Sequence, residues 1–269
     1  MGSFAGHVLP GGMLLFLGLW WGIKFSMFQL TQKNKNRKWQ LISRSNQRRL
    51  EIFEGFILIV FASVGVVSMQ IAGAKVPLYD NTENHWSDMM NLQHCTIFMF
   101  FELAGAMTLL VHTTEAVPLA LDRLVLGLAF LNKGLLISYH IHGQMMVDVT
   151  VHQLLVYIIY VDALILFLEV FHRGNITLEL MRSTVSIVQG SWYWQIGFVL
   201  CPQGPQWDLS NHSNMMFVVM FFSWHLMFAL LFTGLVYCTV SCVHPNKHQW
   251  TSPMEMGLLE KIPKSEDEG

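Results

Sequence analysis

The chain has 269 residues, of which 53% are hydrophobic and 13% are charged, and its mean hydropathy is +0.42. Soluble globular domains usually carry about 25% charged residues, so this composition excludes a soluble globular protein. The formal net charge of −2 indicates little by itself, because the distribution of the charges along the chain is more informative. We therefore expect an integral membrane protein whose main partner is the lipid bilayer, with no nucleic-acid partner.

Seven apolar runs divide the chain, and each is long enough to cross the ~30 Å hydrocarbon core of a bilayer as a helix. The predicted spans are about Val8–Leu30, Leu50–Ala72, Leu92–Val111, Leu119–Tyr139, Thr150–Phe171, Leu178–Leu200 and Met215–Val240. The connections between them leave no room for a separate soluble domain. We therefore predict an all-α integral membrane bundle of seven transmembrane helices over residues 1–242, followed by a cytoplasmic, disordered tail over residues 243–269.

The first connection sets the predicted topology. It holds seven basic residues and no acid before Glu51, namely Lys33, Lys35, Arg37, Lys38, Arg44, Arg48 and Arg49. Short loops rich in lysine and arginine stay in the cytoplasm. Seven spans then place the N-terminus outside and the C-terminus in the cytoplasm. We expect a multi-pass protein of the plasma membrane or the secretory-pathway membranes.

Small features near the membrane surfaces leave several alternatives open. Cys95 and Cys201 both fall near the outer ends of their spans, where they are either bridged or two isolated thiols. Asn211 opens a glycosylation sequon close to the seventh span. Gly18 and Gly22 form a GxxxG pair, which suits close helix packing within the chain or dimerisation. The oligomeric state is therefore not predicted.

Three charged residues, Glu102, Lys133 and Asp162, fall at mid-membrane depth in the predicted spans. Isolated charges at that depth are costly, so they should be paired, neutralised or hydrated. We expect Lys133 to pair with Glu102 or Asp162. The set either fixes helix packing or marks a proton or substrate pathway. A second group, Glu51, Glu54, Glu169, Glu179 and Arg182, lies nearer the inner face, where snorkelling and the basic loop are expected to satisfy it.

The sixth span carries two amides among aromatic residues, in the run Gln189-Gly190-Ser191-Trp192-Tyr193-Trp194-Gln195. Amide side chains in hydrocarbon need hydrogen-bond partners, so Gln189 and Gln195 should face the bundle. The run, with Trp192 and Trp194, lines a binding pocket or supplies hydrogen bonds between helices.

Histidines form the sharpest constellation of the chain, because most of them fall at the predicted outer ends of spans. Imidazole and carboxylate are zinc ligands, and three protein ligands with a water make a catalytic zinc site. A candidate zinc set consists of His94, His140 or His142, Asp148, His152 and His225. Asp148 and His152 are four residues apart, so they share a helix face. The alternatives are a polar pocket without metal and separate structural histidines.

Several motifs resemble the transmembrane protein 45 family, also known as domain of unknown function 716. They are Gly6-His7-x-Leu9-Pro10-Gly11, Asn84-His85-Trp86, Gln93-His94, Tyr139-His140-x-His142-Gly143, Trp224-His225 and the run from Gln189 to Phe198. The nearest branch is the transmembrane epididymal protein group, and the match covers about residues 1–240. The resemblance implies a multi-pass membrane protein of animal membranes and assigns it no biochemical activity.

Three functions follow from these observations. The first, which we favour, is a non-enzymatic protein that binds a small-molecule ligand, a lipid or a partner, or acts in trafficking, through an outer-facing histidine-rich polar cavity. The second is a zinc-dependent intramembrane hydrolase of a lipid amide or ester, whose catalytic residues the sequence does not identify. The third is a transporter or channel that uses Glu102, Lys133 and Asp162.

Overall fold

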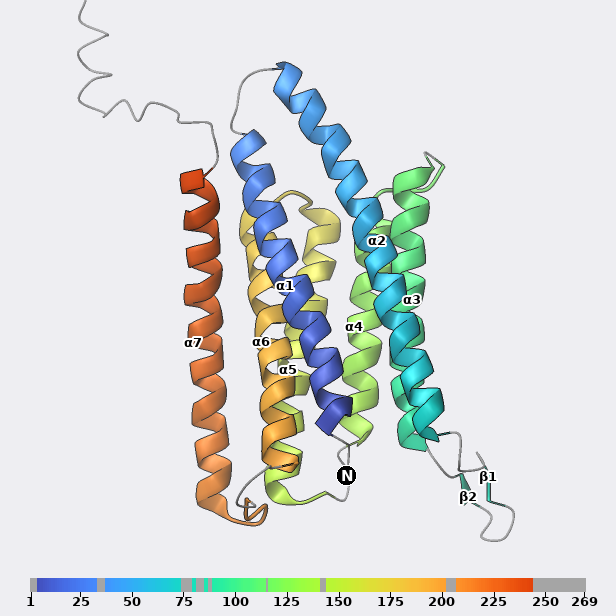
Figure 1. Ribbon diagram of the computed structural model, residues 1–269, viewed down its shortest axis with the longest axis vertical. Helices are drawn as coiled ribbons and strands as arrows, with labels where there is room; N and C mark the ends of the chain where they lie inside the picture. The colour runs from blue at the N-terminus through green and yellow to red at the C-terminus, as the bar shows by residue number, and fades with distance from the viewer. Residues whose placement is uncertain are drawn as a thin grey trace, which may run out of the picture.

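The computed structural model (Figure 1) describes residues 4–32, 37–73, 79–80, 85–86, 89–114, 116–140, 144–201 and 207–243. In these residues, helices α1 to α7 span Phe4–Gln32, Arg37–Gly73, Met89–Thr113, Leu121–His140, Met146–Phe171, Ile176–Leu200 and His212–Val243. Two short antiparallel strands, β1 (Tyr79–Asp80) and β2 (His85–Trp86), lie between α2 and α3. Each predicted span corresponds to one helix, so the all-α seven-helix fold is confirmed. The predicted tail lies almost wholly outside the described residues.

Successive helices run in opposite directions along the bundle (Figure 1). The start of α1 therefore lies at the same end as the α2–α3, α4–α5 and α6–α7 connections. We call this the outer end, following the charge-based prediction, and the opposite end the inner end. Which end faces the cytoplasm stays a prediction.

Five helices, namely α1, α2, α3, α5 and α7, are long and apolar enough by composition alone to cross a membrane. The other two helices, α4 and α6, carry polar residues that lower their mean hydropathy. Among them, Arg123 and Lys133 on α4 and Arg182 and Gln189 on α6 are each no more than 4% exposed. Because these polar side chains face the protein interior, α4 and α6 still present an apolar surface to lipid. The chain is thus an integral, multi-pass membrane protein.

Helices α1 to α6 form a closed ring, in which each helix contacts the next and α1 packs most closely against α6. The seam between α1 and α2 has the sparsest contacts of the ring. Helix α7 packs outside the ring against α1, α5 and α6, and its buried residues are Val218, Ala229 and Thr233. The interior of the protein is therefore the interior of a six-helix ring.

Glycines bring α1 and α6 together along their length. A Cβ atom at Gly11 would lie 2.8 Å from the Gly190 carbonyl oxygen, and one at Gly190 would lie 2.7 Å from the Leu15 nitrogen. Further along, the Ser183 hydroxyl donates to the Gly18 carbonyl at 2.7 Å. Small residues allow such close backbone approach between membrane helices. The predicted GxxxG pair of α1 therefore serves packing within the chain.

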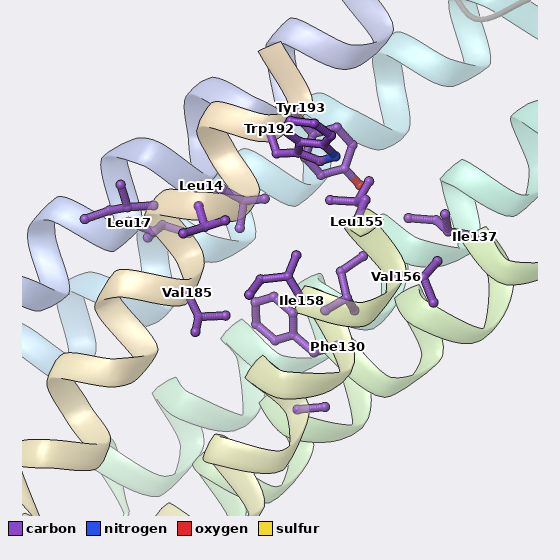
Figure 2. Close-up of a cluster of buried hydrophobic side chains, with 14 of the residues drawn as sticks. Leu14, Leu17, Phe130, Ile137, Leu155, Val156, Ile158, Val185, Trp192 and Tyr193 are labelled. Carbon is purple, nitrogen blue, oxygen red and sulfur yellow. The ribbon is translucent and has the colours of Figure 1, made fainter. Parts of the chain in front are cut away.

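Apolar side chains fill the ring from all sides. Figure 2 shows Leu14 and Leu17 from α1, Phe130 from α4, Leu155 from α5 and Tyr193 from α6 directed toward the interior. Phe130 is 1% exposed and makes an edge-to-face contact with Phe101 of α3 at 5.0 Å between ring centres. These residues fix the distances between helices on which the candidate site depends.

The structure also places two polar and two thiol-bearing residues near the outer end. The Asn211 side chain accepts a hydrogen bond from the Ser213 backbone N–H at 2.8 Å, so it caps the start of α7. Asp208 accepts two bonds from Ser210, which hold the pKa of its carboxyl below the ordinary value. Cys95 is buried and Cys201 is half-buried.

Candidate functional site

A cavity of about 190 Å³ lies inside the ring, and all six of its helices contribute to the lining. Its outer part is polar and is lined by His7, Asn91, His94, Gln144, Asp148 and His152. Its remaining walls are mostly apolar and include Leu14, Leu17, Leu58, Phe61, Leu126 and Phe130, with Lys133 as a charged residue among them. On α1 the lining runs from Gly6 to Trp21, which corresponds to ~22 Å at 1.5 Å per residue. The cavity is thus long, apolar in its depth and polar at its outer end.

The structure brings three residues of the predicted metal set to this cavity. His152 Nδ1 lies 2.8 Å from Asp148 Oδ1 and 3.0 Å from the Asp148 carbonyl oxygen. His94 Nδ1 lies 2.8 Å from the Met90 carbonyl oxygen. The His7 ring, which the metal prediction omitted, lies 5.8 Å from the His152 ring between centres. Bonds at Nδ1 hold the His94 and His152 rings in fixed orientations, which suits a polar binding surface.

The other predicted metal residues do not join this group in the described structure. His225 lies apart from the cavity lining, with Nδ1 2.9 Å from the Ser191 hydroxyl and its ring 5.4 Å from that of Trp192. The side chain of His140 and the whole of His142 lie outside the described residues. Of the described members of the predicted set, His94, Asp148 and His152 are the ones that could hold zinc at the cavity, and zinc binding stays a prediction.

Within the part of the chain that the structure describes, Glu51, His112 and Asp122 have donor atoms that all lie within 4.8 Å of one another. Two arginine side chains already form ion pairs with the carboxylates of this group. Arg123 lies 3.3 Å from Glu51, and Arg173 lies 2.7 Å from Asp122. Because these ion pairs already compensate the two carboxylates, the group has no excess negative charge to attract a metal cation.

Lys133 occupies the cavity wall about two turns from the outer end of α4. Its ammonium donates to Gln189 Oε1 at 2.9 Å and lies 5.4 Å and 5.0 Å from the ring centres of Phe130 and Tyr193. The Gln189 amide in turn donates to Asp162 Oδ2 at 2.7 Å. Lys133 and Asp162 are thus joined through Gln189, a linkage that the sequence did not predict. Glu102 is elsewhere, where it accepts from Ser63 at 2.9 Å.

A second polar group, the inner network, fills the ring toward its inner end. It contains four cations and four acids, which are Lys24, Arg123, Arg173, Arg182, Glu51, Glu54, Asp122 and Glu169. Arg182 is 0% exposed, with Nε 3.1 Å from Glu169 and the guanidinium stacked 4.4 Å from the Trp21 ring centre. The equal numbers of opposite charges make the network electrically neutral when every member is ionised.

The expectation that the acids near the inner face snorkel to water is wrong for most of them. Glu51, Glu54 and Glu169 are between 2% and 4% exposed, and Arg182 is fully buried. The reason is that two cations, which were not predicted to lie in the interior, pair with these acids there. Lys24 and Arg123 each project from a different helix into the ring and supply partners inside the protein. The Trp21 indole also donates to Glu54 at 2.7 Å.

Some of the pocket residues predicted in the sixth span lie in the protein interior, and the others lie at the surface. Gln189 and Trp192 are fully buried, and the Trp192 indole donates to the Val151 carbonyl at 2.9 Å. Trp194 is 37% exposed, and neither it nor Gln195 lines the cavity. Tyr193, which the site prediction omitted, is the aromatic residue of this run at the cavity wall. The sequence could have indicated this, because Tyr193 and Gln189 are four residues apart and therefore lie on one helix face.

Comparison with known proteins supports the predicted resemblance. The sequence profile of the family of unknown function DUF716 matches residues 119–238. Transmembrane epididymal protein 1 of Rattus norvegicus is 27% identical over 285 residues, which cover 100% of this chain and 90% of the rat protein. Transmembrane epididymal protein 1A of Mus musculus is 28% identical over 87% of this chain and 80% of the mouse protein.

The human relative extends the same pattern. Transmembrane epididymal protein 1 of Homo sapiens is 25% identical over 86% of this chain and 85% of the human protein. The rat similarity covers the whole chain, so it includes α1 and its cavity lining as well as the profile-matched residues. The predicted resemblance is therefore confirmed: the chain is similar to the DUF716 family over residues 119–238 and to transmembrane epididymal proteins over most of its length.

Proposed function

We propose that this protein binds a small amphipathic ligand from the bilayer in the cavity of the six-helix ring. The observation that carries the proposal is the division of the cavity into a polar outer part and a long apolar depth. A ligand with a polar head and a hydrocarbon chain matches both parts, because the chain removes apolar wall from contact with water. The head then meets a polar or charged group of the lining.

The seam between α1 and α2 supports entry from the membrane. Phe61 lines the cavity, and its ring contacts that of Phe16 at 5.8 Å between centres, while Phe16 is 45% exposed on the lipid-facing surface. Trp20 and Phe53 make a second contact across the seam at 5.7 Å. Aromatic pairs, rather than glycine-mediated backbone packing, close this part of the ring. Rotation of two aromatic side chains is a smaller change than separation of α1 from α6.

Cavity filling tests the proposal. Ala62 lines the cavity and is 2% exposed, whereas Ala106 is exposed to lipid on α3. Protein purified in mild detergent should carry a bound single-chain lipid in native mass spectra. Ala62→Leu should lower the bound fraction severalfold, and the matched control Ala106→Leu should leave it unchanged. Equal occupancy in both variants, or wild-type protein without ligand at added lipid, would contradict the proposal.

A zinc-dependent hydrolase remains a second candidate on one observation, the pairing of His152 with Asp148 beside His94 in the same cavity. A carboxylate that accepts from a histidine orients the ring for a metal. In such an enzyme the bound amphipathic ligand would be a lipid amide or ester. Stoichiometric zinc in protein purified without a histidine tag would favour this candidate over simple binding.

A further inference from the structure

Lys133 stands out because its charge has no direct counter-ion in the described structure. It is 4% exposed, and among the residues 4–32, 37–73, 89–114, 116–140, 144–201 and 207–243 no carboxylate forms an ion pair with it. The hydrogen-bond partner of its ammonium is the neutral amide of Gln189. A buried ammonium requires compensation by charge or by several hydrogen bonds.

The nearest acid, Asp162, is already engaged. Its Oδ2 accepts from Gln189 at 2.7 Å and from Ser186 at 3.1 Å. Gln189 keeps the two charged groups one side chain apart, so Asp162 compensates Lys133 only at a distance. A lysine ammonium has three donors, and the bond to Gln189 uses one of them.

The surroundings of Lys133 differ from those of every cation in the inner network. Lys24, Arg123, Arg173 and Arg182 each lie within 3.4 Å of a carboxylate oxygen, and none of the four lines the cavity. Lys133 lines the cavity without such a partner. The faces of Phe130 and Tyr193 beside the ammonium favour a cation, and they leave the cavity side of the group open to a ligand.

We propose that Lys133 is an anion-binding residue and that the amphipathic ligand is a single-chain carboxylic acid whose carboxylate pairs with the Lys133 ammonium. This inference rests on the proposed function, because it assigns the ligand class of the same cavity. One ammonium beside a neutral amide matches one negative charge. A phosphate head, with more acceptor oxygens, is better matched by arginine, and no arginine lines the described cavity. The apolar residues on either side of Lys133, including Leu17 and Ile137, leave wall for the hydrocarbon chain.

The test compares two ligands that differ in the head group alone. Wild-type protein in nanodiscs of zwitterionic lipid is titrated with radiolabelled oleic acid and with oleyl alcohol at neutral pH. We expect oleate to bind at least tenfold more tightly, since a charge-assisted bond contributes about that factor. Equal binding of the acid and the alcohol would overturn the inference and leave the proposed function intact. Failure of both to bind would contradict the proposed function itself.

Variants at Lys133 and Gln189 test whether the preference for oleate over oleyl alcohol depends on the Lys133 charge. Lys133→Met should bring oleate affinity down to that of oleyl alcohol, without weakening the alcohol, and Lys133→Arg should restore part of the preference. Gln189→Glu places a carboxylate beside Lys133 as an internal counter-ion, so it should also abolish the preference. Gln195→Glu is the matched control, because it adds the same charge to α6 away from the cavity lining. A preference that survives in Gln189→Glu and Lys133→Met would overturn the assignment.

A third ligand separates the two sources of negative charge. Lysophosphatidic acid with the same chain should compete with oleate less well than unlabelled oleate does. Stronger competition by the phosphate would overturn the carboxylate assignment while leaving Lys133 as the anion site.

Discussion

The Arg182 guanidinium lies 4.4 Å from the ring centre of Trp21, so a buried charge stands directly behind an aromatic wall of the cavity. Arg182 also approaches Glu169, which in turn lies 3.4 Å from Arg123. Through these contacts, a cavity residue on α1 is coupled to charges on α4, α5 and α6. The inner network therefore supports the shape of the candidate site.

Removal of Arg182 should destabilise the protein strongly. Arg182→Met leaves Glu169 with less compensation inside the ring, and breaking a buried ion pair commonly costs about 3–5 kcal/mol. The free energy of unfolding, measured by denaturant titration in mixed micelles, should fall by that amount. The double variant Arg182→Met with Glu169→Gln removes both charges and should recover much of the loss. A single variant as stable as wild type would contradict the structural importance of this pair.

Adjacent glycines of α1 should respond differently to the same substitution. A Cβ at Gly11 would lie 2.6 Å from a Trp194 side-chain carbon and 2.8 Å from the Gly190 oxygen, while one at Gly12 would meet no atom within 4 Å. Gly11→Ala should therefore cost about 1–3 kcal/mol through overpacking. Gly12→Ala should be neutral or slightly stabilising, since alanine favours the helix. Unfolding midpoints in detergent compare the pair, and equal midpoints would argue against the close α1–α6 approach.

Any zinc bound by this chain should depend on the cavity histidines and not on His225. His152→Ala and His94→Ala should each lower the zinc content measured by elemental analysis of untagged protein. His225→Ala should leave it unchanged, because that ring bonds to Ser191 outside the cavity lining. A protein that takes up no zinc when it is offered would assign the histidines to hydrogen bonding. Loss of zinc in the His225 variant alone would contradict the described geometry.

Closing the seam between α1 and α2 should slow ligand exchange. A short bis-maleimide that links Phe16→Cys to Phe61→Cys, in a background with the native cysteines changed to serine, holds the two helices together across the aromatic contact. Exchange of a bound lipid should slow by at least tenfold, whereas its equilibrium affinity changes much less. The two single-cysteine variants treated with the same reagent are the controls. Unaltered exchange in the linked protein would exclude this route of entry.

The sequence predicted the helices well because the bilayer imposes a minimum apolar length on each span. Every predicted span coincides with a helix to within a few residues at most ends, although α1 and α2 extend further toward the connections. That extension brings His7 into α1 and hence into the cavity, which the predicted start at Val8 had excluded. The apolar runs alone predicted the bundle, but they did not predict the additional helical turns beyond the ends of these runs.

The candidate site was less predictable because pairing between helices depends on the rotation of each helix. The sequence indicated that Lys133 and Asp162 lie at similar depth, but it did not identify Gln189 as the group between them. Lys24 and Arg123 went unnoticed as interior cations because single charges near a span end are usually satisfied by water. The spacing of the acids on α5 could have found part of this, since Asp148, Asp162 and Glu169 are separated by multiples of seven residues and so share a helix face.

The position of α7 outside the ring bears on how the protein is made. In the described structure, the cavity lining ends at Leu200 of α6, and α7 adds no residue to it. During synthesis, α1 has to wait for α6 before the ring can close, because these two helices form its closest contact. The last helix is not needed for that closure. The cavity can therefore close while α7 is still emerging from the ribosome.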